Sequence, residues 1–402
     1  MKPFIENDSM IMIGVIQEQH SDRCRLFQQW QKLDFPIAQD LLNTNGINVV
    51  PVYIGIDEFG VVKGRMRRPQ DFIDNVLNAK SEKPNKEFPQ ISLNDIKIDE
   101  RKRKAQETGS VDNLVRLGDA LIQWNAESSD SIIQAIDSYQ RALQAAESKS
   151  PKTSRADIQF RIATSNRLLY EAQGQRDPDL FWKSVQLWEN ALKTNPNQYI
   201  YRRRIEQYGP RLKKPYSFYD WVSIARDEIR ERGEVPVQLA VEPNGAELAK
   251  KTKSLTVDSE QTNPDPDARV TVVEQDWVKV HFNTVPTNPK PGDVVAVHLG
   301  FHLSDNAKWN HETAPLKVWL NIPKNGAKLS NQLGVDLTPY QSAESQKPIS
   351  ISYEMKLPDA QDGRAAETQI TGFALFNVCE SIDGQCIFRR RDFHFTIKDP
   401  TR

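Results

Sequence analysis

The chain has 402 residues, enough for two or three domains, and its 38% hydrophobic and 27% charged residues are ordinary for a soluble protein. Its formal net charge of -1 gives no overall electrostatic reason to bind nucleic acid or an anionic membrane. No run approaches the roughly eighteen apolar residues of a membrane-spanning helix, and three cysteines are too few for a disulfide-built scaffold.

The most informative part of the chain lies between residues 10 and 62. Residues 11–16 form a short apolar run rich in β-branched side chains, which predicts a fully buried strand of a parallel or mixed sheet. A helix should follow, since Ser21 and Asp22 can cap it. Three side chains at a spacing of three should face the sheet from that helix: Cys24, Phe27 and Trp30.

Two further strands are expected around a tight turn. Residues 49–56 form a second apolar run, and residues 57–60 lead from it into Val61 and Val62, which predicts a β-hairpin. Pro51 is unusual in such a run because proline cannot donate to a β-ladder. It indicates the start or the edge of a strand, often with a constrained or cis peptide bond.

A closing helix over residues 69–79 completes a β-α-β-β-α order. This order, with a proline opening the hairpin, resembles the C-terminal half of the thioredoxin fold, in its redoxin branch. The resemblance implies that Val50 and Pro51 form the cis-proline loop, which in that family receives an extended substrate segment. The family's first half, with its CxxC motif or peroxidatic cysteine, would precede residue 11, where this chain has ten residues. Residues 1–80 are therefore expected to be a partial thioredoxin-like domain without its redox centre.

Neither Cys24 nor His20 is expected to replace that centre. Cys24 falls in the helix after the first strand, away from the family's active position, and an isolated buried cysteine is usually inert. His20 precedes the helix and is expected to be solvated. We assign neither residue a chemical role.

Residues 81–110 are expected to be a linker, because charge is high there and aromatic residues are rare. This stretch contains the basic run 101–104, and two further basic runs occupy residues 202–204 and 389–391. With a balanced net charge, each run is typical of a solvated face rather than of a nucleic-acid site.

Residues 111–233 predict helices throughout, with Ser128 at the break before the second helix. Two helix pairs resemble tetratricopeptide repeats, and the small and closing positions of that pattern are Gly118, Ala142, Ala163, Ala191 and Pro196. The spacing is longer than in the family, at 24 residues from Gly118 to Ala142 and 28 from Ala163 to Ala191. The resemblance implies a groove for a peptide or partner protein, and a spacer between two domains fits equally well.

A last helix of this region, over residues 216–232, should pack Phe218, Trp221 and Ile224 inward. Residues 234–268 are expected to be a connector that ends in a stretch rich in proline and aspartate.

From residue 269 to 402 the hydrophobic period changes to two, which predicts an antiparallel β-sandwich. His298 and His302 share a face of one strand, but no third ligand stands at a convincing position, and we assign no metal site. The expected strands are residues 269–282, 293–303, 315–322, 349–357, 369–378 and 387–397.

Cys379 and Cys386 are the only two reactive side chains whose spacing in the sequence indicates that they act as a pair. A loop over residues 381–384 would place them directly opposite each other on a hairpin, about 4.5–5.5 Å apart at Cα, a separation that a disulfide can bridge. A stabilising disulfide, two reduced thiols and a redox-active pair all fit this pattern.

The segment LFNVCESIDGQCIFRRRDFHFTI, with Pro291 to Asp293 and Trp309 upstream, carries a second resemblance. Residues 285–398 resemble the immunoglobulin-like N-terminal domain of the transmembrane thiol:disulfide interchange reductase, and a β-domain that follows thioredoxin-like and NHL-repeat modules in larger proteins. The resemblance implies that Cys379 and Cys386 are a redox pair that exchanges with a thioredoxin-like partner.

The sequence thus predicts a multidomain chain with α/β, all-α and all-β parts: a partial thioredoxin fold, a helical-repeat region and an immunoglobulin-like β-sandwich. Two alternative functions are expected. The first is thiol:disulfide exchange or an antioxidant role, with Cys379 and Cys386 as the redox pair. The second is that of a non-catalytic scaffold for protein–protein interaction, which uses the tetratricopeptide-like helices and the partial thioredoxin-like domain. The expected partner is a thioredoxin-like or other protein, with no nucleic acid and no membrane span. No cofactor is expected, since GxGxxG, P-loop and HExxH motifs are absent. As the chain stands we expect it in the cytoplasm, and a longer N-terminus would place it outside.

Overall fold

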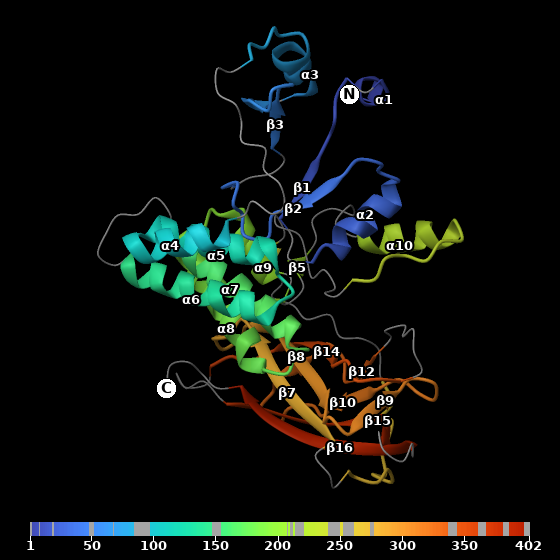
Figure 1. The fold of residues 1–402 in the computed structure, drawn as a ribbon. Coiled ribbons are helices and arrows are strands. Elements are labelled where there is room, and N and C mark those ends of the chain that lie inside the picture. Colours follow the sequence, from blue (N-terminus) through green and yellow to red (C-terminus); the bar gives the residue numbers. More distant parts are fainter. Residues whose placement is uncertain are drawn as a thin grey trace.

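Helical and β-rich parts follow one another along the chain in a mixed α/β multidomain fold (Figure 1). The β-rich C-terminal part lies at the bottom of Figure 1, the main group of helices lies above it, and a small hairpin stands at the top. The computed structural model describes residues 2–7, 9–17, 20–47, 52–66, 68–83, 97–146, 154–206, 208–209, 212–213, 221–239, 250–251, 261–273, 277–336, 344–360, 367–380 and 386–397.

The N-terminal part contains a short parallel strand pair and a helix. Helix α1 (Lys2–Glu6) precedes strand β1 (Gly14–Ile16), which pairs in parallel with β2 (Ile37–Gln39) across helix α2 (Asp22–Gln31). The prediction of a fully buried strand over residues 11–16 is wrong, because Ile11, Ile13 and Val15 are 80%, 59% and 55% exposed. The reason is that β1 is paired with β2 alone in a two-stranded sheet, so no second layer covers these side chains.

Helix α2 packs on another helix rather than on a sheet, which corrects the expected orientation of its apolar stripe. Its partner is α10 (Trp221–Glu231), nearly 200 residues later, and the two lie side by side in Figure 1. Leu26 is fully buried against Val222, Ala225 and Ile229, and the ring of Trp30 stacks on that of Trp221. Of the three side chains expected to pack inward from this last helix, Trp221 does so, Ile224 is 40% exposed, which corrects that part of the prediction, and Phe218 lies outside the described residues.

The predicted hairpin is confirmed as β3 (Tyr53–Ile56) and β4 (Val62–Met66), an antiparallel pair. Asp57 stabilises the turn because its carboxylate accepts hydrogen bonds from the amides of Phe59 and Val61. Helix α3 (Pro69–Phe72) and the π-helix η1 (Ile73–Leu77) follow. The π-helix η1 packs closely on β3, since a Cβ added to Gly55 of β3 would lie 2.8 Å from the side chain of Val76 in η1. The hairpin and the β1–β2 pair are separate two-stranded sheets.

The expected linker over residues 81–110 contains a helix, and for that part the prediction is wrong. Helix α4 (Ile98–Thr108) buries Ala105 and packs against the next helix, α5. A charged amphipathic helix needs only one narrow apolar stripe to be held in this way. The following helices are α5 (Val111–Trp124), α6 (Ser129–Ala145), α7 (Arg155–Ala172), α8 (Pro178–Thr194) and α9 (Tyr199–Glu206).

Residues 111–206 are largely helical, as the sequence predicts, and each of the helices α5 to α8 packs on the next one in the chain. Ser110, Ser128 and Ser154 cap three of them by accepting backbone hydrogen bonds. The small residue Gly118 lies directly against the ring of Tyr139, where no Cβ would fit. Because α7 buries 13 of its 18 residues, it is the central helix of this part.

Two antiparallel sheets form the C-terminal part and share one core, which holds side chains of both, such as Phe301 and Phe376. One sheet has the order β12-β10-β15-β9-β13 with β16 beside β15, and the other has the order β11-β14-β8-β7. The strands are β7 (Val278–Val285), β8 (Val294–Leu303), β9 (Ala307–Asn310), β10 (Lys317–Leu320), β11 (Lys328–Leu329), β12 (Leu333–Val335), β13 (Glu344–Ser345), β14 (Ile349–Lys356), β15 (Thr368–Glu380) and β16 (Cys386–Ile397). A further short pair joins β5 (Leu212–Lys213) to β6 (Lys250–Lys251).

The first expected strand, over residues 269–282, begins later than predicted. Strand β7 starts at Val278, whereas residues 261–273 lie along the outer face of the larger sheet. Val270 packs there on Trp319 and Phe373, so its apolar character serves this contact.

The helices and the sheets share a packed junction. Phe181, Trp188 and Tyr208 form one apolar cluster with Val285 and Ala296 of the sheet. Within the described residues, no helix combines the length and the hydrophobicity needed to cross a bilayer.

Candidate functional site

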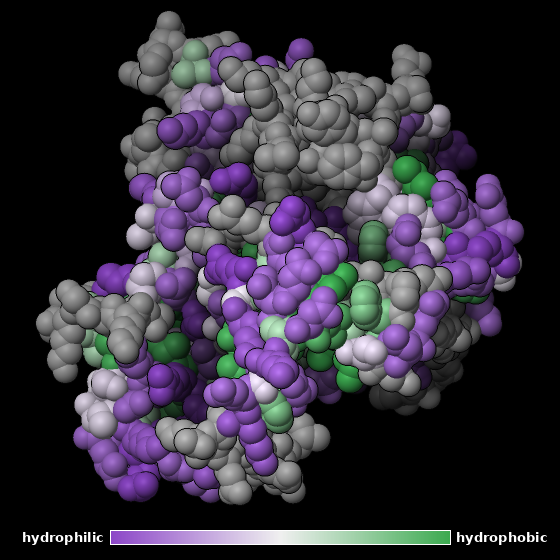
Figure 2. All heavy atoms as spheres, turned by 90° about the horizontal axis from the view of Figure 1, so that it is seen from above, coloured by the Kyte–Doolittle hydropathy of each residue, from purple (hydrophilic) through white to green (hydrophobic). Residues whose placement is uncertain are grey.

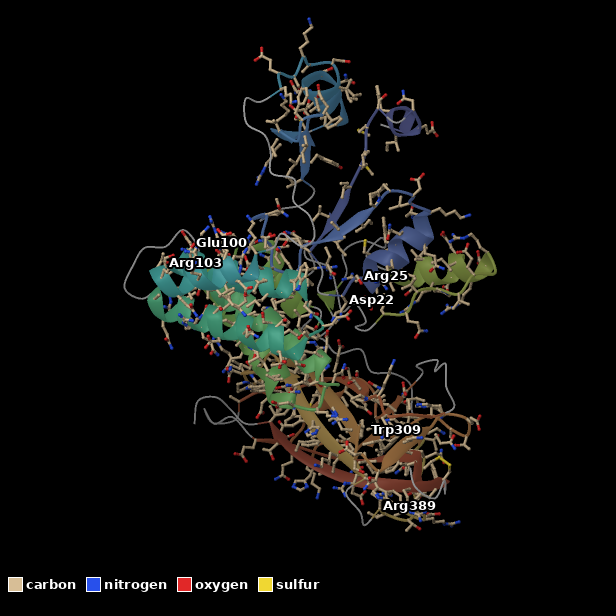
Figure 3. The ribbon with its side chains drawn as sticks, viewed as in Figure 1. Asp22, Arg25, Glu100, Arg103, Trp309 and Arg389 are labelled. Carbon is tan, nitrogen blue, oxygen red and sulfur yellow. A yellow bond between two sulfur atoms is a disulfide. The ribbon has the colours of Figure 1, made fainter. Side chains whose placement is uncertain are left out.

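The cysteine pair lies at the loop end of the long hairpin made by β15 and β16. Cys379 and Cys386 are directly opposed in the register of the two strands, as the sequence predicts, and their sulfur atoms are joined in a disulfide. Figure 3 shows the disulfide as a yellow bond in the β-rich part of the molecule. The loop between the two cysteines lies outside the described residues.

The two cysteines differ in exposure. Cys379 is only 2% exposed, and it lies on β15, the strand between β9 and β16. Cys386 is exposed, and so is Phe388 two residues further along the same face of β16. An attacking thiolate from solvent can therefore reach the sulfur of Cys386 more readily than that of Cys379.

A lysine completes a row of three side chains across the sheet. Lys308 of β9 is paired with Cys379 on the side opposite Cys386, while Ala307 and Trp309 on either side of it are buried in the core. Directly opposed residues share a face and lie within contact range. Lys308 was not among the residues predicted from the sequence. The alternation of Ala307, Lys308 and Trp309 was the signal that could have revealed this strand.

Further along the same outer face, an arginine anchors the segment that covers the sheet. The guanidinium of Arg390 lies 3.9 Å from the centroid of the Phe373 ring and donates a 2.7 Å hydrogen bond to Asp265. Burial alone would raise the pKa of Asp265, but hydrogen bonds from Arg390 and from the amides of Arg269 and Val270 hold it below the ordinary value. This ion pair links β16 to residues 261–273, the segment that lies on the outer face of the sheet.

The other residues singled out from the sequence are Val50, Pro51 and Cys24. Val50 and Pro51, predicted as a substrate loop, lie outside the described residues. Cys24 lies on α2, a helix that packs on α10. The disulfide lies on β15 and β16, whose main contacts in the described part of the chain are with each other and with neighbouring strands.

His20 corrects the expectation of a solvated side chain. Only 14% of its side chain is exposed, and its Nε2 lies 3.4 Å from both a Glu171 carboxylate oxygen and the Tyr208 hydroxyl. Burial lowers the pKa of His20, against the opposing effect of Glu171. His20 therefore ties the N-terminal part to the helices.

A buried arginine organises the same junction and was also missed by the sequence analysis. The guanidinium of Arg167 lies 4.8–5.0 Å from the ring centroids of Tyr170, Phe181 and Tyr208, and it donates to Glu171 at 2.8 Å. Tyr170 and Glu171 lie one turn from Arg167 on α7, whereas Phe181 and Tyr208 belong to later segments, and hydrophobic periodicity gives no signal for those two contacts.

His298 and His302 have separate environments. The ring nitrogens of His298 lie 2.8 Å from the Ser352 hydroxyl and 2.7 Å from the carbonyl oxygen of Tyr208. His302 instead packs edge-on against His281. Burial lowers the pKa of both His298 and His302 to about 4. Among the residues that the structure describes, no group of three side chains could hold a metal ion.

No protein-family model matches this chain, and no curated protein matches it. Among solved structures it is similar to the yeast GGA1 GAE domain, at 8% identity and a TM-score of 0.20, over 31% of this chain and 95% of that chain. It is also similar to the alkylpurine DNA glycosylase AlkC of Pseudomonas fluorescens bound to DNA containing an abasic site analogue. That match has 10% identity and a TM-score of 0.15, over 80% of this chain and 86% of that chain. At these TM-scores neither similarity bears on what this chain does.

Proposed function

We propose that the protein carries out thiol:disulfide exchange with a thioredoxin-like partner, and that Cys379 and Cys386 are its redox pair. The observation that carries this proposal is the row of Lys308, Cys379 and Cys386 across three strands. This row aligns the exposed residue Cys386, the buried residue Cys379 and the cationic residue Lys308 across one face of the sheet. The immunoglobulin-like character of this β-domain and the thioredoxin-like character of residues 1–80 belong to the same proposal.

The exchange takes two steps. A partner thiolate attacks the exposed sulfur of Cys386, a mixed disulfide forms, and Cys379 leaves as a thiolate. The Lys308 ammonium stabilises that anion, since a neighbouring cation lowers the pKa of a thiol. The second thiolate of the partner then attacks the mixed disulfide and releases Cys386. The partner is oxidised to a disulfide by two electrons, and the cysteine pair is reduced to the dithiol form.

A redox titration tests this proposal. The full chain is equilibrated with glutathione at graded ratios, the free thiols are alkylated, and mass spectrometry measures the oxidised fraction at Cys379 and Cys386. A role in thiol:disulfide exchange requires a midpoint reduction potential between about -180 and -270 mV for the cysteine pair. A Cys24→Ser variant serves as the control, because the midpoint must not depend on the third cysteine. A disulfide that stays oxidised below about -300 mV would contradict the proposal and leave the pair with a stabilising role.

The second candidate function is a non-catalytic interaction scaffold, and one observation favours it. Large apolar side chains are exposed across the N-terminal part, which is typical of a surface that another protein covers. Figure 2 shows hydrophobic side chains among hydrophilic ones on the face seen from above. The exposed residues in question are Ile11, Ile13, Val15, Tyr53, Ile54, Ile56 and Val62. A structural disulfide in the titration would make this the better account.

A further inference from the structure

Four of the six histidines of the chain lie where the helices meet the four-stranded sheet of β11, β14, β8 and β7. Helix α8 packs on β7 at this junction, as Figure 1 shows. The four residues are His20, His281, His298 and His302. Because histidine is the side chain that ordinarily gains charge between pH 7 and 5, a fall in pH adds charge mainly at this junction.

His298 connects the sheet to the helices. A carbonyl oxygen can only accept, so Nε2 of His298 carries the proton and donates to the Tyr208 carbonyl at 2.7 Å, while Nδ1 accepts from the Ser352 hydroxyl at 2.8 Å. The ring also lies edge-on to Phe181 of α8, with centroids 5.7 Å apart. Burial and the charge of Arg167 both oppose a positive charge on this ring.

The surroundings of His302 also oppose a positive charge. His302 is 6% exposed, and its Nδ1 has no hydrogen-bond partner within the described part of the chain. The groups that act on it are His281, whose ring centroid lies 4.8 Å away, and Arg176 in the turn before α8. Lys279 stands opposite His302 in the strand register. A proton on His302 therefore meets basic groups on the neighbouring strand and on the helical side.

The other two histidines have carboxylates nearby that compensate a bound proton. Burial and a lysine lower the pKa of His281, and two aspartates at the start of α8 raise it. Burial lowers the pKa of His20, a glutamate and an aspartate raise it, and two arginines lower it. The charged groups around His281 are Lys279, Asp177 and Asp179, and those around His20 are Glu171, Arg167, Asp22 and Arg204. The response to pH is therefore dominated by His298 and His302.

We propose that this junction is a pH-operated hinge, at which the helices and the four-stranded sheet separate in mild acid as His298 and His302 bind protons. Separation places both imidazoles in water, away from Arg167 and Arg176. The core between the two sheets stays folded, because the two histidines alternate along β8 with residues of that core and so leave the opposite face of the strand.

The closed junction loses stability as the pH falls. Burial lowers the pKa of His298 and of His302 to about 4 in the closed form, whereas in water both return to about 6.5. The separated form therefore binds protons first, and the closed form is fully favoured above about pH 6.5. Between pH 7 and 5 each histidine shifts the equilibrium toward separation roughly tenfold, and the two together roughly a hundredfold.

Two kinds of contact hold the junction closed at neutral pH. Aromatic side chains of α8 pack with Val285 and Ala296 of the sheet. Thr287 donates from its amide and from its hydroxyl to the Glu189 carboxylate, at 3.0 and 2.6 Å. A variant with a weaker contact here should therefore open at a higher pH.

Small-angle X-ray scattering of the full chain at pH 7 and pH 5, at constant ionic strength, tests the hinge. The radius of gyration should rise at pH 5. Amide protection, corrected for the intrinsic exchange rate, should fall about tenfold over β7 and be retained over β15. The double variant His298→Gln/His302→Gln should stay closed at pH 5, since glutamine does not titrate. His394→Gln is the matched control, because His394 is exposed on β16, and it should open as the wild type does.

Thr287→Ala tests the hinge without touching a histidine. Loss of the hydroxyl bond to a charged group weakens the closed form about tenfold, and with two protons bound on opening the pH of opening should rise by about half a unit. If the double variant unfolds at pH 7, this shift decides the question. The proposal is overturned by identical scattering at both pH values, by wild-type opening of the double variant, by loss of protection in β15 together with β7, or by an unchanged pH of opening in Thr287→Ala.

Discussion

Lys308 and Cys379 lie directly opposite each other on strands β9 and β15, so that their side chains leave the same face of the sheet. If Cys379 is the leaving group in exchange, Lys308→Gln should remove a positive charge that stabilises the Cys379 thiolate and slow reduction by dithiothreitol roughly three- to tenfold. Stopped-flow kinetics of the single-turnover reduction measures this rate.

The matched control for that experiment is Lys328→Gln, because Lys328 is exposed on β11 of the other sheet. Its reduction rate should equal that of the wild type. Equal slowing in both variants would mean that general surface charge, and not the neighbour of Cys379, sets the rate.

Leu26 holds α2 on α10, and its truncation should release both helices. Leu26→Ala removes a fully buried side chain from the contact with Val222, Ala225 and Ile229, at a cost of about 2–5 kcal/mol. Amide hydrogen exchange over residues 221–231 should become faster as the contact weakens. Arg25→Ala, one residue away and exposed, is the control and should leave exchange unchanged. Unchanged exchange in Leu26→Ala would show that α10 is held by other contacts.

The close approach of Gly118 to Tyr139 predicts an unusual sign for a glycine substitution. In an exposed helix, Gly→Ala stabilises by about 1 kcal/mol. Here the added Cβ meets the Tyr139 ring, and Gly118→Ala should destabilise by about 1–3 kcal/mol in urea unfolding. In a Tyr139→Leu background the same substitution should lose this penalty. A penalty that persists without the Tyr139 ring would refute the packing explanation.

His298, which lies where the sheet meets the helices, predicts that the stability of the protein depends on pH. Burial lowers the pKa of His298 to about 4 from its ordinary 6.5, so the folded protein keeps this side chain neutral over that interval. The unfolded chain binds the proton first as the pH falls, and stability should therefore drop between pH 6.5 and 4, by at most about 3 kcal/mol for this residue. The pKa of His302 is also lowered, so a substitution of His298 alone should remove only part of the pH dependence of stability.

Urea unfolding midpoints at pH 7 and pH 5 measure this dependence. His298→Gln should show a smaller difference between the two values than the wild type does, because glutamine does not titrate. The control is His394→Gln, since His394 is exposed on β16. An unchanged difference in His298→Gln would show that the junction does not resist protonation at this site.

Local features of the sequence determined the hairpins, the helix caps and the pairing of the cysteines. The register of Cys379 and Cys386 follows from the loop length and the period of two, which act within a few residues. Ser128 caps its helix because the orphan amides that it satisfies belong to the next three residues. The turn at Asp57 is local in the same sense.

The tertiary structure alone decided which apolar faces meet. The stripe on α2 could cover a sheet or a helix with similar burial, and the position of α10 settled the choice. The position of His298 beside Tyr208 depends on how the helices pack against the four-stranded sheet. The place of Lys308 beside Cys379 depends on β9 entering the sheet next to β15. Burial depends on surfaces that come from distant segments, whereas the periodicity of a sequence describes only one surface at a time.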